Sequence, residues 1–226
     1  MIVIGAGNAA TLAEVEPMSE KNQFAHATAG SDLELEQSIL LLQGPFGNGP
    51  HQREYLQAVR YLLDHAAQAH SRLLGLLQSE RASNPYAVIE ILPRFGLQES
   101  VPILAELMAR GPTNLCQASA QALAVHPLDD AREALIHGLS LARKDVVIAA
   151  ADGLMSRGDA LACPALKKLL THPDPDLRYH VIQAAGSLSC LKRVTLSAVA
   201  RDDQSDEIRE LAKQFIQIAT NPGDNR

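Results

Sequence analysis

A repeat of 31 residues runs through the chain from about residue 52 to residue 219, without insertions. Stepping by 31 places apolar residues in the same columns: Tyr61, Leu92, Leu123, Leu154, Ala185, Ile216; Ala58, Ile89, Ala120, Ala151, Ile182; Leu73, Leu104, Leu135, Leu166; Leu77, Met108, Leu139, Leu170. Polar residues and helix breakers keep the same step: Asp145, Asp176, Glu207; Gly96, Pro127, Gly158; Pro102, Pro164. A constant period of this length indicates an array of stacked structural units.

Each period contains the apolar spacing of two helices. In residues 145–157, Val147, Ala150, Ala151 and Leu154 follow the i, i+3, i+4, i+7 pattern of one helix face. Gly158 then interrupts the pattern, and a second apolar stripe follows. Asp174-Pro175 and Asn84-Pro85 have the residue types of a helix N-cap followed by proline at the first helical position.

The first helix of each unit is predicted near residues 52–63, 84–95, 114–125, 145–157 and 176–187, and the second near 66–79, 98–110, 129–142, 160–171 and 190–201. The sequence therefore predicts an all-α solenoid, a right-handed superhelix of about five helix pairs, with capping helices at 32–43 and about 205–219. We expect one domain over residues 31–221, between tails at 1–30 and 222–226. Arg178 and Arg209, together with the acids two residues before them, Asp176 and Glu207, are expected to make bonds between adjacent repeats.

Units such as DPDLRYHVIQAAGSLS and RFGLQESVPILAELM resemble the short HEAT-like repeats first noted in phycobilisome lyases, and the resemblance covers roughly three quarters of the chain. It implies the solenoid fold. Its implications for function are broad, because proteins of this kind include scaffolds, assembly factors and a few enzymes.

The opening sequence, Ile2-Val3-Ile4 followed by Gly5-Ala6-Gly7-Asn8-Ala9-Ala10, has the spelling of a dinucleotide-binding turn. Such a turn needs a second strand with an acidic residue about 20 positions further on. The following stretch has no second apolar strand, and the helical array begins by residue 52. We therefore expect no nucleotide cofactor at this turn.

Composition narrows the possible functions. The formal net charge is −6 and tryptophan is absent, which disfavours nucleic acid as a partner, including the mode of DNA glycosylases built from HEAT-like repeats. No apolar run is long enough to span a membrane, and no secretion signal is evident. Cys116, Cys163 and Cys190 are interpreted as small core residues in a reducing compartment. These features predict a cytoplasmic protein without a membrane partner.

No constellation of residues specifies a reaction or a metal. The His-Glu pairs of deoxyhypusine hydroxylase, an iron enzyme of this repeat class, do not occur. His126 and His172 precede proline and are interpreted as helix ends. His65 and His70 are assigned to a solvated turn, with a metal pair as the less favoured alternative. We expect no catalytic, cofactor-binding or metal-binding residues, although catalysis is left open.

Family geometry places the second helices on the concave face. The candidate partner-binding residues there are Glu106, Arg132, His137, Lys167, Lys168 and Arg193, with Val199 in the same column. They would form a groove that is acidic at one end and mildly basic toward repeats four and five. The preferred hypothesis is a non-catalytic adaptor, scaffold or assembly chaperone that binds another protein. The alternative, from the resemblance, is a bilin lyase-like or other tetrapyrrole-handling protein, with His137, Lys168 and Arg193 as generic candidates.

Overall fold

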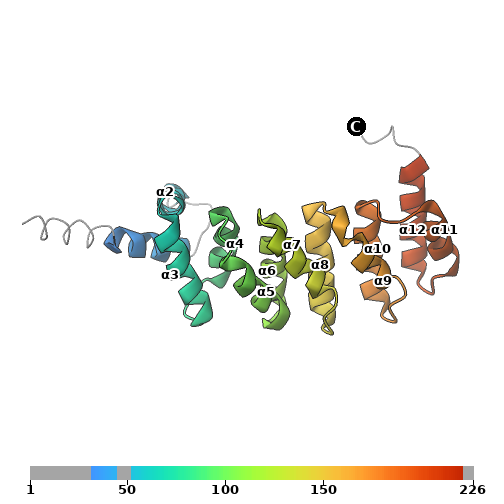
Figure 1. Cartoon of the computed structure of the whole chain (residues 1–226), viewed down its shortest axis with the longest axis horizontal. Coiled ribbons are helices and arrows are strands. Elements are labelled where there is room, and N and C mark those ends of the chain that lie inside the picture. Colours follow the sequence, from blue (N-terminus) through green and yellow to red (C-terminus); the bar gives the residue numbers. More distant parts are fainter. Residues whose placement is uncertain (1–31, 45–51, 221–226) are drawn as a thin grey trace, which may run out of the picture.

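The computed structural model describes residues 32–44 and 52–220, and these residues form a row of stacked helices (Figure 1). The first helices of the five pairs are α2 (Gln52–Asp64), α4 (Pro85–Phe95), α6 (Thr113–Val125), α8 (Lys144–Arg157) and α10 (Pro175–Ser187). The second helices are α3 (Ala66–Gln78), α5 (Ser100–Arg110), α7 (Asp129–Gly138), α9 (Cys163–Lys168) and α11 (Arg193–Asp202). A helix over residues 32–42 precedes this array, and α12 (Asp206–Thr220) closes it.

The helices lie in two layers. First helices contact the first helices of neighbouring repeats, from α2 through α4, α6, α8 and α10 to α12. In the second layer α3 contacts α5, and α5 contacts α7. The part of the chain that the structure describes contains no β-strand. These observations confirm the predicted all-α solenoid with a helix at each end. The predicted tails and the glycine-rich opening lie outside the described residues.

The apolar columns of the repeat form the core. Leu92, Leu123 and Leu154 are fully buried at the same position of successive first helices. Small residues allow these helices to approach closely. A Cβ on Gly153 would lie 3.1 Å from the carbonyl oxygen of Ala120 on α6. The small residues of the first helices therefore let each helix pack directly against the backbone of the next one, at the same position in each repeat.

The predicted helix starts are confirmed at two caps. The Asn84 side chain accepts a hydrogen bond from the Ala87 N–H, and the Asp174 side chain accepts from the N–H groups of Asp176 and Leu177. The fourth second helix is shorter than predicted. Residues 160–162 form a 3₁₀ turn, and α9 covers only Cys163–Lys168 of the expected 160–171.

Arg178 connects adjacent repeats, as predicted. Its Nε and Nη2 donate to the two carboxylate oxygens of Asp203 at 3.0 and 2.9 Å, and its Nη1 donates to the carbonyls of His172 and Pro173. The hydrogen bonds from Arg178 lower the pKa of Asp203 despite its burial. Arg209 donates to the Asp203 carbonyl at 2.7 Å. The two arginines thus fix the loop between α11 and α12.

The interpretation of all three cysteines as free thiols is wrong. Cys163, at the start of α9, and Cys190, between α10 and α11, form a disulfide with a Cα–Cα distance of 5.2 Å. Cys116 is free and buried, as expected, and burial raises its pKa. Disulfides are typical of oxidising compartments. The cysteines therefore no longer support the predicted cytoplasmic location.

Two histidines are buried. His126 ends α6, as predicted. Its Nε2 donates to Ser100 Oγ at 3.0 Å, since that hydroxyl already donates to the Leu97 carbonyl. The Nδ1 of His126 accepts from the Leu128 N–H, so the ring is held neutral, and burial lowers its pKa. The assignment of His70 to a solvated turn is wrong, because this residue is buried within α3.

Candidate functional site

The second helices carry the predicted partner-binding residues. Glu106 on α5, His137 on α7, Lys167 and Lys168 on α9, and Arg193 on α11 are all exposed. The side chains of His137, the two lysines and Arg193 have no hydrogen-bond or ion-pair partner among residues 32–44 and 52–220. We call the surface formed by α3, α5, α7, α9 and α11 the second-helix face. The cations on its α9 and α11 part are thus free to meet an anionic group.

Arg132 differs from the other candidates. Its guanidinium lies within 2.9 to 3.4 Å of the carboxylates of Asp129, Glu133 and Asp159, and its side chain is only 15% exposed. Asp159 belongs to the loop that leads into the next second helix. The visible role of Arg132 is therefore to bind neighbouring repeats together, and its role in partner binding stays a prediction.

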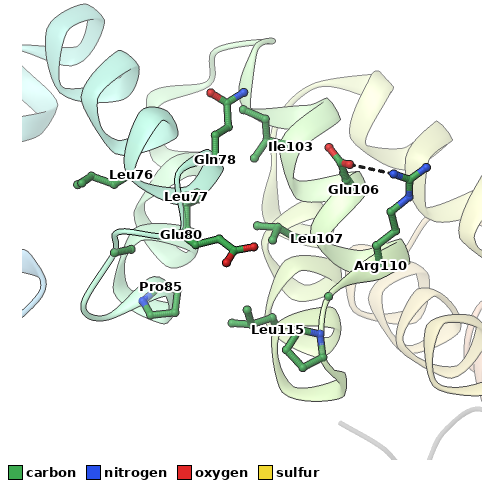
Figure 2. Close-up of a pocket in the computed structure, with 13 residues that line it drawn as sticks. Leu76, Leu77, Gln78, Glu80, Pro85, Ile103, Glu106, Leu107, Arg110 and Leu115 are labelled. Atoms are coloured by element: carbon green, nitrogen blue, oxygen red, sulfur yellow. Dashed lines mark hydrogen bonds and ion pairs between the residues drawn. The ribbon is translucent and has the colours of Figure 1, made fainter.

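A cavity of about 590 Å³ opens on the second-helix face between α3 and α5. Figure 2 shows the end of α3 and the following loop on one side of it, and α5 on the other. Half-buried apolar side chains form most of its wall: Leu76, Ala82, Pro85, Ile103, Leu107 and Leu115. We call this hollow the α3–α5 cavity. Its volume falls within the range of small-molecule and side-chain binding pockets.

Charged groups stand at the rim of the α3–α5 cavity. Glu106, one of the predicted site residues, pairs with Arg110 at 3.3 Å, and both side chains are well exposed. Glu80 extends from the loop after α3 into the space facing α5 (Figure 2). The Glu80 carboxylate has no partner among the described residues. The cavity therefore combines an apolar wall with one unpaired carboxylate.

The repeat register shows how this place differs from the equivalent places in later repeats. Pro85 stands three repeats before Arg178. The guanidinium of Arg178 bonds to the loops that follow α9 and α11 and so joins the ends of these two helices. One repeat after Pro112 stands Arg143, whose Nη1 donates to the carbonyls of Ala109 and Gly111 at the end of α5. Two prolines thus replace the two arginines that join repeats elsewhere, and both line the α3–α5 cavity.

The corresponding place between α9 and α11 is built differently. That hollow, of about 550 Å³, is lined by Arg178 and Asp203, which are already bound to each other, and by Val199 of the predicted column. Its charged groups are used within the chain. Of these two equivalent places, the α3–α5 cavity is the one with an unpaired charged group and an apolar wall.

The opposite face, formed by first helices, has a smaller hollow of about 400 Å³ between α8, α10 and α12. Lys144 pairs with Asp174 and Asp176 at 2.8 and 2.7 Å, and His180 Nδ1 lies 3.1 Å from the Asp152 carboxylate. The side chain of Glu207, which also lines this hollow, has no hydrogen-bond or ion-pair partner among the described residues. These bonds join consecutive first helices. They indicate a structural role on this face.

Sequence reasoning identified Glu106 but missed the cavity beside it. The signal was present as a departure from the repeat, namely proline at positions 85 and 112. Within the described residues no group of three or more histidine, cysteine, aspartate or glutamate side chains could hold a metal ion. No helix among residues 32–44 and 52–220 is long and apolar enough to cross a bilayer.

Comparison with known proteins agrees with the fold. Residues 129–217, from α7 into α12, match the sequence model of the family described as HEAT repeats. No curated protein matches the chain. The matched segment includes Arg178, Asp203 and the disulfide, and the repeat register extends the same architecture back to α2. The family match and the two layers of stacked helices together support a HEAT-like repeat protein.

Proposed function

We propose that this chain is a protein–protein interaction module that binds a partner segment along its second-helix face. The observation that carries the proposal is the α3–α5 cavity, an open apolar hollow on the same face as the unpaired cations of α9 and α11. HEAT repeats are commonly interaction modules, which supports the general class of function.

The physical advantage of such a face is its preformed shape. Each repeat is fixed by its neighbours, so binding orders few residues of this chain and loses little conformational entropy. Burying one leucine-sized side chain of a partner in the cavity contributes about 1.5–3 kcal/mol. Lys167 and Lys168 would add attraction for acidic residues of the partner, which favours correct orientation more than affinity.

The test is quantitative capture with tagged protein, followed by mass spectrometry. Partners that use this face should be lost with the double variant Lys167→Glu/Lys168→Glu and with Ala82→Trp, which fills the cavity. Lys213→Glu, an exposed lysine on α12, is the matched control and should keep them. If all three variants capture the same proteins as the wild type, this face is not the binding surface.

The tetrapyrrole-handling alternative rests on the family resemblance and stays a prediction. The absorption spectrum of a bilin mixed with the purified protein tests it directly. A shift and sharpening of the long-wavelength band would support it, whereas a spectrum identical to that of free pigment would remove it.

A further inference from the structure

Glu80 holds an unusual backbone conformation at the edge of the α3–α5 cavity. Its φ of 55° lies in the left-handed region, which costs free energy for any residue that carries a Cβ. The Arg81 N–H donates to the Leu76 carbonyl and the Glu80 N–H to the Leu77 carbonyl, which is the hydrogen-bond pattern of a Schellman helix end. Glycine is the usual residue at this position, so glutamate here has a stability cost.

A second residue shows the same conformation without a cavity. Ser189 also has a φ of 55° and ends α10 with the same two hydrogen bonds. In the repeat register Ser189 corresponds to Gly96 and Gly158, which have φ values of 65° and 72°. Ser189 lines none of the hollows described above. The chain thus offers an internal control for the backbone effect at Glu80.

The α3–α5 cavity favours an occupant that carries a positive charge. Glu80 contributes an unpaired carboxylate, and the second carboxylate at the rim, Glu106, is only weakly held by Arg110 because both side chains are exposed. The wall between them is apolar. An occupant that buries an apolar side chain and carries a cation beside it would satisfy both features.

We propose that the α3–α5 cavity receives an apolar side chain of the partner segment with a neighbouring lysine or arginine, whose cation binds the Glu80 carboxylate. This inference rests on the proposed function, because it specifies the partner chemistry for the same face. Glutamate is present at position 80 for binding, and the left-handed backbone directs its side chain across the cavity.

A phage-displayed library of random dodecapeptides is a suitable probe, since the natural partner is not needed. Peptides enriched on the wild-type chain, relative to Ala82→Trp, should contain an apolar residue within two positions of a lysine or arginine. Enriched peptides that lack basic residues would overturn this inference and leave the proposed function standing. If the wild-type chain enriches nothing over Ala82→Trp, both fail.

Three variants then separate charge from backbone strain. We expect Glu80→Gln to raise the Kd of an enriched, fluorescently labelled peptide about fivefold, because an exposed ion pair contributes affinity of this size. Glu80→Gly should weaken it similarly while raising the urea midpoint of unfolding. Ser189→Gly should raise the midpoint and leave the peptide affinity unchanged. Affinity unchanged in both Glu80 variants would overturn the role of this carboxylate.

Discussion

Replacing Arg178 with methionine tests how adjacent repeats are held together. Methionine keeps most of the apolar stem but removes the guanidinium. Arg178 is buried, with 8% of the residue exposed. The Asp203 carboxylate, itself only 9% exposed, then loses two hydrogen bonds and keeps one from the Ser205 N–H. Removing one partner of a buried pair costs about 3–5 kcal/mol. Because the Ser205 bond remains, we expect a loss near the lower end, about 3 kcal/mol.

Urea unfolding followed by circular dichroism at pH 7 measures this loss, with both proteins fitted to a common slope. Arg201→Met is the matched control, since Arg201 pairs with Asp202 on the exposed surface and its removal should shift the midpoint little. A shift for Arg178→Met no larger than that of the control would show that the Arg178–Asp203 pair does not hold the repeats together.

The same pair predicts a pH dependence. Arg178 lowers the pKa of Asp203, so the contribution is fully present above the unfolded pKa of about 3.9. It is lost as the pH falls through the lower folded value. The difference in stability between wild type and Arg178→Met should therefore narrow in strong acid, and a constant difference would contradict this assignment.

Three further predictions address single residues. Ser189→Gly should raise the free energy of unfolding by about 1 kcal/mol, because it relieves a left-handed residue; an unchanged or lower stability in urea would contradict this. Reducing the Cys163–Cys190 disulfide, which spans 27 residues, should cost about 3.5 kcal/mol from loop entropy, and the double serine variant should not respond to reductant. Thiol titration of the unreduced, unfolded chain should then detect only Cys116, whereas three thiols would exclude the disulfide. Burial lowers the pKa of His126, so the unfolded state binds more protons and stability should fall as pH drops below about 6.5. The slope of stability against pH between 6.5 and 5 should be smaller in His126→Gln, and equal slopes would count against this histidine.

The helices were predictable because each repeat places its apolar residues where its neighbours need them. Leu92, Leu123 and Leu154 are 31 positions apart in the sequence and fully buried in the structure. Caps such as Asp174-Pro175 marked the helix starts for local chemical reasons. Arg178 was assigned correctly because an arginine recurs one period later, at Arg209.

Features that depend on how neighbouring loops meet were not predictable. Cys163 and Cys190 are 27 positions apart, which is not a repeat period, and they meet because α9 packs against α10, whose end leads into Cys190. Pro85 was interpreted as a helix start, and the space it leaves open depends on the placement of α3 against α5. Arg132 was assigned to an open surface, but Asp159 from the loop before α9 contacts it in addition to Asp129 and Glu133 of its own helix.

Backbone amide chemical shifts of the ¹⁵N-labelled chain, recorded during titration with a library-selected peptide, test the binding face most directly. We expect the largest changes at residues 76–82 and 103–115, which border the α3–α5 cavity. Changes confined to first-helix residues such as Tyr179 and His180 would contradict it.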